Sequence, residues 1–425
     1  MTATPLLLRA GDGKDYTQLA VYQAAGGYRA LRKALAKKPA EIVDEVKKAN
    51  LRGRGGAGIA AGTKWGFVPQ NTGKPVYLVV NADEGEPGTF KDRYFLGADP
   101  HRLVEGILIT CHAVGAKVAY VYVRGEFTHE IDVLEKAIDD ARKAHLVGPN
   151  VAGTAFSCDI WVHRGAGAYV CGEETALLES LEGKPGKPRL KPPFPAVVGA
   201  FGCPTVINNV ETISAVPVIL EQGGEAWAAL GVERDGGVKV FGLSGHVARP
   251  GLYELPMGFN LKQFIYEVGG GLPDGRALKG VIPGGSSTPV LLPDEIDVAL
   301  GFDSMMKAGT MLGTGCVTVI GEGVCMVRLA WRMARFYAHE SCGQCTPCRE
   351  GTAWVAKVLG RFEDGSARLE DIDLILKICN TIEGNTICAL GDACAMPVRA
   401  IVKKFRAEFE AHVQKGGCPF DHNVQ

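Results

Sequence analysis

The 425-residue sequence has no apolar run long enough to cross a membrane as a helix. Its most apolar stretch, residues 103–123, is interrupted by Glu105, His112 and Lys117, whereas a spanning helix needs about 20 predominantly apolar residues. The leucine run at positions 6–8 is short and no basic segment precedes it, so we expect no secretory signal. Any membrane association is therefore expected to come through partners.

The sequence also lacks an excess of either charge. Lysine and arginine number 46 and aspartate and glutamate 47, which gives a formal net charge of -1. With no basic tail, there is no electrostatic reason to expect nucleic acid as a partner. The hydrophobic share of 46% is that of an ordinary globular protein, and the length predicts two to four domains.

Cysteine, in contrast, is plentiful. An odd number, 13, in a chain without a secretory signal indicates a reducing compartment, and favours metal binding or buried thiols over disulfides. Cys342, Cys345 and Cys348 have C-x2-C-x2-C spacing, and Gly343 and Pro347 let the short loop wrap so that all three sulfurs face one point. This spacing predicts a 4Fe-4S cluster, which needs a fourth thiolate from elsewhere.

Four downstream cysteines are candidates for the fourth ligand. Cys379 falls on the apolar stripe of a helical segment, Cys394 lies inside the next helical segment, and Cys418 follows it. Cys388 comes after the break at residues 383–385 and before a new helix, so it is free to bend toward the triplet and is our choice. Zinc is the alternative metal, although structural zinc sites more often combine two C-x2-C pairs.

The central part of the chain alternates between strands and helices. Strands are predicted at 76–80, 117–123 and 158–163, and helices at 101–114 and 129–144. This alternation predicts an α/β domain with a mostly parallel, Rossmann-like sheet.

Two glycine-rich segments are candidate ligand loops. Gly53, Gly55 and Gly58 match G-x-G-x-x-G, but they follow a helix, not a strand, so the match alone is weak. Four glycines within residues 53–58 nonetheless let the backbone approach an anionic or planar ligand, with Arg54 and Lys64 as nearby cations. A tight structural loop is the alternative.

The second segment, 164–175, lies between a strand and a helix, the setting that a nucleotide site requires. Tyr169 is placed to pack on a ring, and Glu173 or Glu174 to hold sugar hydroxyls. Further candidates are the acidic segment 81–88, which follows a strand, the Lys191 to Pro195 loop, and the amides of Asn208 and Asn209 at an expected helix start. For each of these, a purely structural role is the alternative.

The C-terminal half changes in character. Residues 236–323 predict a small α+β unit, for which a ubiquitin-like β-grasp is the obvious candidate. Beyond it, helical segments at 324–339, 349–359, 369–382 and 392–413 predict an up-and-down four-helix bundle that carries the cysteines. The expected division is therefore a helical segment 1–50, an α/β domain 51–235, a β-grasp domain 236–323 and a bundle 324–425.

Taken together, these motifs resemble the NADH-binding flavoprotein subunit of respiratory complex I over nearly the whole chain. The resemblance implies an FMN-binding α/β domain, a β-grasp domain and a helical bundle that holds one 4Fe-4S cluster. The motifs that carry it are residues 53–58, 81–84, 86–88, 164–175, 191–195, 208–212 and 341–350.

The resemblance also implies roles for individual residues. It implies that FMN is held by the glycine loop, which includes Gly55 and Gly58. The residues implied to hold FMN are Gly53, Arg54, Gly56, Lys64, Asn81, Asp83, Glu84, Asn208, Asn209 and Thr212. Tyr169, Gly172, Glu173 and Glu174 would border both flavin and nucleotide, while Glu86, Lys191, Phe67 and Phe194 would meet NADH; Glu86, Tyr169 and Glu173 would be catalytic. Cys342, Cys345, Cys348 and Cys388 match the cluster ligands.

The chain departs from the family at one point. The family usually has Phe-Pro-Thr-Gly after the glycine loop, where this chain has Ile59-Ala60-Ala61-Gly62. Adenine stacking is therefore expected to rest on Phe67 and Phe194. An aromatic contact contributes about 0.5 to 1.5 kcal/mol beyond its buried area.

Electron counting gives the expected function. NADH gives up two electrons as a hydride and iron-sulfur clusters carry one, so a flavin must stand between them. We therefore expect NADH:quinone oxidoreductase activity, with a thioredoxin-like 2Fe-2S subunit and an iron-sulfur subunit of the peripheral arm as partners, on the cytoplasmic face of the inner membrane. The alternatives are the flavin subunit of a soluble NAD-linked hydrogenase or formate dehydrogenase and, in another class, a zinc-stabilised scaffold subunit.

Overall fold

The computed structural model describes residues 5–69 and 72–420. The chain divides into two units, each described by itself below. The first comprises Met1–Gly85, Phe90–Phe241 and Leu252–Gly258, and the second Glu86–Thr89, Gly242–Gly251 and Phe259–Gln425. The finer four-segment division expected from the sequence stays a prediction.

A parallel sheet of four strands forms the centre of the first unit, with the strand order β3-β2-β1-β4. Three of its strands were predicted, and the structure confirms them. Their runs of β-branched, aliphatic and aromatic residues suit a sheet that is covered on both faces. The fourth, β4, was not predicted: it has five residues and ends in two asparagines. The strands are β1 (Tyr77–Ala82), β2 (Val118–Val123), β3 (Asp159–Arg164) and β4 (Thr205–Asn209).

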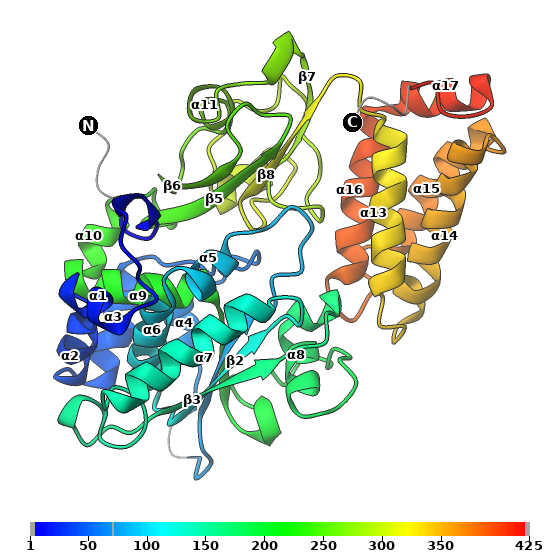
Figure 1. Cartoon of the computed structure of the whole chain (residues 1–425). Coiled ribbons are helices and arrows are strands. Elements are labelled where there is room, and N and C mark those ends of the chain that lie inside the picture. Colours follow the sequence, from blue (N-terminus) through cyan, green and yellow to red (C-terminus); the bar gives the residue numbers. More distant parts are fainter. Residues whose placement is uncertain (1–4, 70–71, 421–425) are drawn as a thin grey trace. The chain divides into compact units, whose positions relative to one another are not determined.

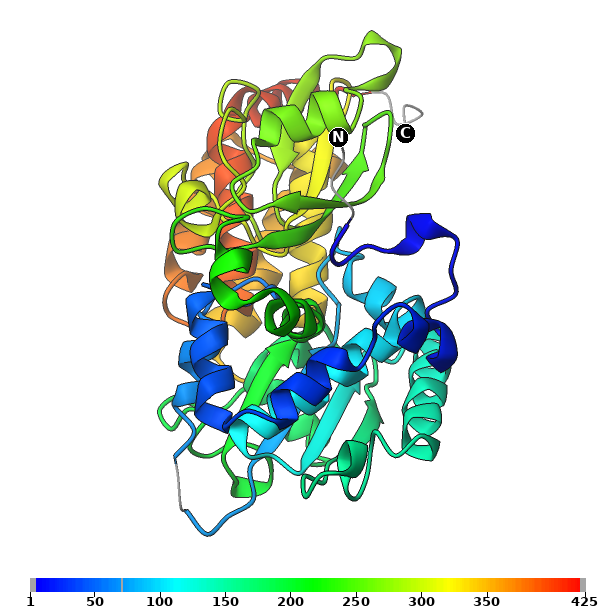
Figure 2. The ribbon, with the colours of Figure 1, turned by 90° about the vertical axis from the view of Figure 1, so that its left-hand side faces the viewer.

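Helices pack on this sheet and on one another. The apolar helix α6 is buried along almost its whole length and packs against α9, and both contact β1. The N-terminal helices α2 and α3 pack in turn on α6 and α9 (Figure 1 and Figure 2). The helices of this unit are α1 (Leu19–Ala24), α2 (Arg29–Leu35), α3 (Pro39–Lys48), α4 (Ala61–Gly66), α5 (Asp92–Gly97), α6 (Pro100–Val114), α7 (Thr128–Lys143), α8 (Glu174–Leu181), α9 (Val210–Gln222) and α10 (Gly224–Ala228).

The strand order reverses between β1 and β4. From β1 the chain proceeds to β2 and then to β3 on one side, whereas β4 pairs with β1 on the other. In open α/β sheets such a reversal leaves a crevice at the carboxyl ends of the two strands, and ligands bind there. The two carboxyl ends are Asn81-Ala82 of β1 and Asn208-Asn209 of β4.

A second sheet is mixed, with the order β6-β5-β8-β7. Strand β8 runs parallel to β5 and antiparallel to β7. This sheet agrees with the small α+β fold predicted for residues 236–323. The elements are β5 (Val238–Gly245), β6 (Gly251–Pro256), β7 (Leu278–Ile282), β8 (Cys316–Gly321), α11 (Leu261–Gln263), α12 (Phe302–Lys307) and the π-helical turn Phe264–Val268.

The C-terminal helices form the predicted bundle with one difference. The last predicted helix, 392–413, is two helices, because the chain turns at Phe405. The short last helix, α17, crosses one end of the bundle and contacts the other four helices (Figure 1). The helices are α13 (Met326–Glu340), α14 (Thr346–Asp364), α15 (Leu369–Ile382), α16 (Leu390–Lys404) and α17 (Arg406–Lys415). Within residues 5–69 and 72–420, no helix has both the length and the apolarity needed to span a membrane.

Candidate functional site

The glycine loop lies on the N-terminus of α9, beside the point where the strand order reverses. The backbone N–H of Arg54 donates to Oγ1 of Thr212 over 2.8 Å. A Cβ atom at Gly55 would lie 3.1 Å from Cβ of Asn209, and Gly56 has a φ of 127°, which favours glycine. The structure thus brings two predicted segments, 53–58 and 208–212, into contact with bare backbone between them. This cradle suits a planar or anionic group at a helix N-terminus.

The side chain of Arg54 does not face that cradle. It is 1% exposed, pairs with Asp235 over 3.2 Å, and donates to the carbonyl oxygens of Gly236 and Val238. The sequence suggested a cation beside the ligand. The structure instead gives this guanidinium a supporting role beneath the loop, because its buried charge finds a carboxylate there.

A buried ion cluster continues this support under α9. The carboxylate of Glu211 pairs with Lys239 over 2.8 Å and with Lys91 over 2.9 Å, and all three side chains are fully buried. Burial raises the pKa of Glu211, but attraction to Lys239, Lys91 and Arg54 outweighs it and lowers that pKa to about 2. Lys91 also pairs with Asp92 over 2.7 Å, so the carboxylate of Glu211 stays charged and tied into a network.

The end of β1 is built from polar contacts. Asn81 donates through Nδ2 to the carbonyl of Gly172 over 2.8 Å, and accepts from the N–H of Asp83. The carboxylate of Glu84 accepts from the N–H groups of Lys91, Asp92 and Arg93 at the start of α5. Glu84 was predicted to hold FMN, but the structure uses its side chain as a helix cap.

The segment between β3 and α8 brings other predicted residues to the same edge. Tyr169 begins the 3-10 turn Tyr169–Gly172, and its ring edge would lie 3.3 Å from a Cβ at Gly85. Glu173 is the N-cap of α8, where its Oε2 accepts from the N–H groups of Thr175 and Ala176. Its other oxygen, Oε1, pairs with Lys191 over 3.0 Å, and the roles predicted for Glu173 and Glu174 stay predictions.

A set of partly exposed charges surrounds the start of α8. Lys64 pairs with Oε2 of Glu174 over 2.8 Å, and Lys191 reaches Oε1 of both Glu173 and Glu174, over 3.0 and 3.1 Å. Burial raises the pKa of Glu174, but Lys64 and Lys191 outweigh it and the net shift is downward, so this carboxylate is ionised. We call these four residues the α8 charge set.

Three apolar side chains of the same unit are exposed. Phe67 is 61% exposed, Phe194 58% and Ile59 54%. Large apolar side chains that remain in water after folding are available to a ligand ring. These are the two aromatic residues predicted to meet adenine, and the isoleucine that replaces the family phenylalanine.

Glu86, predicted to meet NADH, belongs to the second unit. Its Oε1 accepts from the N–H of Ser287 over 2.7 Å and from Oγ of Ser286 over 3.4 Å. The predicted contact of Glu86 with NADH stays a prediction.

The predicted cluster cysteines lie at the ends of the bundle helices. Cys342 and Cys345 are on the loop between α13 and α14, and Cys348 is in the first turn of α14. Burial raises the pKa of the Cys348 thiol, and the neighbouring Cys345 and Cys342 add to that rise. The fourth, Cys388, lies on the loop between α15 and α16.

These surroundings fit an anionic iron-sulfur cluster. The positive end of the 19-residue helix α14 is at the triplet, and Cys345 is its N-cap residue without using its side chain as a cap. Cys379 is fully buried in α15, as the sequence predicted, and Cys394 is fully buried in α16. Cys388 is partly exposed, in keeping with its place on a loop.

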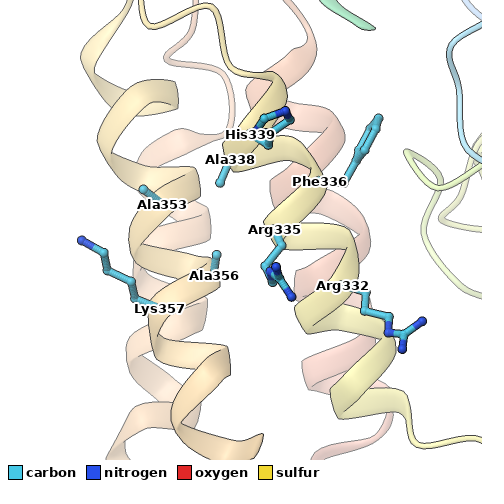
Figure 3. A pocket seen from close by; sticks show the side chains of 8 residues that line it. All are labelled: Arg332, Arg335, Phe336, Ala338, His339, Ala353, Ala356 and Lys357. Carbon is cyan, nitrogen blue, oxygen red and sulfur yellow. The ribbon is translucent and has the colours of Figure 1, made fainter.

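A pocket of about 580 Å³ lies between α13 and α14 (Figure 3). Four of its lining side chains carry nitrogen: Arg332, Arg335, His339 and Lys357. None of its lining residues is one of the predicted site residues, so the pocket does not correspond to the predicted flavin, nucleotide or cluster sites.

The sequence analysis missed the residues that hold the loops in place. Lys91, Asp92, Glu211, Asp235 and Lys239 are charged, and charged residues are ordinarily expected at the surface. The only local signal was the position of Glu211, which falls inside the predicted segment 208–212 at a helix start.

Comparison with known protein families matches three parts of the chain. Residues 46–218 match the Nuo51 FMN-binding domain, residues 240–291 an SLBB domain, and residues 328–412 the NADH-ubiquinone oxidoreductase-F iron-sulfur binding region. The first covers the glycine loop and both strand ends, and the last covers the four predicted cluster cysteines.

Full-length relatives are similar to this chain. An NADH-quinone oxidoreductase F-subunit of Rhizobium meliloti is 54% identical, over 98% of this chain and 99% of that protein. The corresponding F-subunit of Mycobacterium bovis is 50% identical, over 98% of this chain and 95% of that protein. Among solved structures, NAD+-reducing [NiFe]-hydrogenase in the air-oxidised state superposes with a TM-score of 0.84 at 37% identity, over 96% of this chain and 67% of the other.

Proposed function

Because the chain belongs to the family of NADH-quinone oxidoreductase F-subunits, we propose a function in which the crevice between β1 and β4 is its reaction site. The chain is an NADH dehydrogenase subunit with FMN and a 4Fe-4S cluster as cofactors. It takes a hydride from NADH to FMN and passes the electrons to the cluster, on the way to quinone. FMN supplies the exchange between a two-electron donor and a one-electron carrier.

The observation that carries this proposal is the glycine loop on the N-terminus of α9. We assign the flavin to this loop and to the neighbouring Asn81, Asn208 and Asn209, with Thr212 fixing the loop. The other members of the proposed FMN set are Gly53, Gly56, Lys64, Asp83 and the backbone of Arg54 and Glu84.

One experiment tests the flavin site. The purified chain is expected to contain one non-covalent FMN, which heat denaturation releases. Gly55→Val should abolish flavin binding, because its side chain would press on Asn209. Gly11→Val is the control, since Gly11 has no neighbour within 4 Å of a built Cβ and no left-handed φ. Flavin that stays with the precipitate, or a normal flavin content in Gly55→Val, contradicts the proposal.

We assign the choice of NADH over NADPH to Glu174. A carboxylate beside a ribose accepts from the 2′-hydroxyl and repels a 2′-phosphate, and Lys64 and Lys191 keep this carboxylate ionised. Glu174→Gln is expected to keep FMN and NADH oxidation, and to raise kcat/KM for NADPH relative to NADH with ferricyanide as acceptor. Glu173→Gln is the matched comparison. If only Glu173→Gln changes the ratio, the two roles are swapped.

The cluster proposal rests on the triplet at the N-terminus of α14 and on Cys388. Cys388→Ser is expected to lose cluster iron, whereas Cys379→Ser and Cys394→Ser should keep it because both thiols are buried in helices. Iron lost from Cys379→Ser or Cys394→Ser, with iron kept in Cys388→Ser, means that the fourth ligand is misassigned.

The chain is one component of a multi-subunit complex. We assign it a thioredoxin-like 2Fe-2S subunit and an iron-sulfur subunit as direct partners, and membrane contact only through other subunits. The fold likeness to an NAD+-reducing hydrogenase supports the second candidate, a soluble hydrogenase. Tagged chain purified from its own cell distinguishes the two: quinone reduction by the complex supports the first, and hydrogen-dependent NAD+ reduction the second.

A further inference from the structure

Four potential metal ligands meet where α17 crosses the end of the bundle. They are Cys325, which is the N-cap residue of α13; Glu363, in the last turn of α14; His412, in α17; and Cys418, which follows α17. Their donor atoms all lie within 4.8 Å of one another. Among the described residues, this is the group whose spacing suits a single metal ion, and it shares no residue with the predicted cluster cysteines.

The imidazole of His412 is arranged as a metal ligand. It is 1% exposed, and its Nδ1 lies 2.7 Å from the carbonyl oxygen of Glu408. A carbonyl oxygen only accepts, so Nδ1 carries the proton and Nε2 has a free lone pair. Nε2 lies 3.4 Å from Sγ of Cys325, inside the group. Metal-bound histidines have this same second contact, because it fixes the tautomer and the ring orientation.

Glu363 gives independent support. Its side chain is 8% exposed, and its Oε2 accepts from Nε and Nη2 of Arg328 over 2.8 and 2.6 Å. Its Oε1 is buried and has no hydrogen-bond partner. A buried carboxylate oxygen without a donor is costly and uncommon. A cation among the four ligands would satisfy this oxygen.

The donor set selects the metal. We propose that Cys325, Glu363, His412 and Cys418 bind one zinc ion in a closed, four-coordinate site. Two thiolates and an imidazole are softer ligands than magnesium or calcium accept, and four ligands suit tetrahedral zinc. Two thiolates and a carboxylate leave one negative charge on a zinc complex, which the guanidinium of Arg328 offsets.

Such a site would hold α17 and the segment after it against the bundle. The four ligands come from α13, α14, α17 and the segment after α17, so one ion would join elements that are far apart in the sequence. The zinc would be structural, because all four positions are occupied by protein and none is open to a substrate.

The test uses the full chain isolated with its flavin and iron-sulfur cluster. Elemental analysis should give one zinc per chain beside the iron. X-ray absorption at the zinc edge should show two sulfur ligands at about 2.3 Å and two nitrogen or oxygen ligands at about 2.0 to 2.2 Å. Zinc with four sulfur ligands would be zinc in the cluster cysteines, and it would overturn the proposal.

Variants complete the test. Cys418→Ser and His412→Gln are expected to lower zinc to background while flavin and iron stay unchanged, which shows that the chain still folds. Cys203→Ser is the matched control, since Cys203 is also a partly exposed thiol and belongs to the first unit. Zinc that is equal in all variants and removed by brief dialysis against a chelator is an adventitious ion only. That outcome, or a Cys325–Cys418 disulfide in the unreduced protein, contradicts the proposal.

Discussion

The charges beneath the glycine loop and those at the start of α8 are organised in opposite ways. Beneath the loop, Lys91, Glu211 and Lys239 are fully buried and bonded to one another. In the α8 charge set, Lys191 is 28% exposed and Glu174 22%. The first group has no contact with water, whereas the second is partly exposed to it.

This difference matches two kinds of ligand. A resident cofactor benefits from a rigid cradle, and buried pairs with all partners in place give that rigidity. A substrate that enters and leaves at every turnover needs charges that can re-pair when it binds. Four predictions test this contrast, in order of decreasing effect.

The buried cluster should be the more sensitive to mutation. Glu211→Gln removes the one carboxylate that Lys91 and Lys239 share, and leaves buried ammonium groups with too little countercharge. Breaking a buried pair in this way costs about 3 to 5 kcal/mol. Urea unfolding followed by circular dichroism measures it. Glu174→Gln should cost under about 1 kcal/mol in the same assay, as exposed pairs do. Equal losses would remove the distinction between the two groups.

Protonation of Glu84, whose carboxylate accepts from the N–H groups of Lys91 and Asp92 beside the buried cluster, should affect the stability of the fold. Burial and the neighbouring Asp92 raise the pKa of Glu84 from its ordinary 4.5 to about 7. A raised folded-state pKa adds stability below pH 4.5, and this is lost as the pH rises through 7. At 1.36 kcal/mol per pKa unit, the change is about 3 kcal/mol. The stability of the wild type relative to Glu84→Gln should therefore fall between pH 4.5 and 7. A difference that is constant or rises over this range contradicts the assignment.

The α8 charge set should affect binding and not folding. Lys191→Met leaves Glu173 and Glu174 without a shared cation, so the site becomes more repulsive to the pyrophosphate of NADH. We expect KM for NADH to rise about tenfold, equivalent to about 1.4 kcal/mol, with kcat and the unfolding midpoint unchanged. Lys184→Met is the control, because Lys184 is an exposed lysine that pairs with Glu182. A lower unfolding midpoint with an unchanged KM would place Lys191 in the framework instead.

The smallest effect is expected at the exposed aromatic side chains. Phe194→Ala should raise KM for NADH roughly two- to tenfold, since an aromatic contact contributes about 0.5 to 1.5 kcal/mol. Ile59→Phe should lower KM by a similar factor, because it restores the ring that the family has. Steady-state kinetics with ferricyanide measures both. Leu230→Ala, at another exposed apolar side chain, should change neither KM nor kcat.

Local elements, and the chemistry they carry, could be predicted from the order of the residues alone. Strands β1 to β3, helices α6 and α7 and the cysteine triplet were predicted because each depends on neighbours in the chain: apolar periodicity, glycine and proline positions, and C-x2-C spacing. The resemblance to a family followed from several such motifs in one order. These features needed no tertiary information.

Long-range packing, in contrast, determines which charged residues are buried and which strands pair. Arg54 and Asp235 are 181 residues apart, and no local pattern indicates that they meet. Strand β4 exists because β1 offers it a partner, and Glu84 caps α5 because the chain turns back there. The group of Cys325, Glu363, His412 and Cys418 likewise depends on α17 crossing the bundle. A buried charge is tolerated only where its counter-charge arrives, and only the folded chain brings the two together.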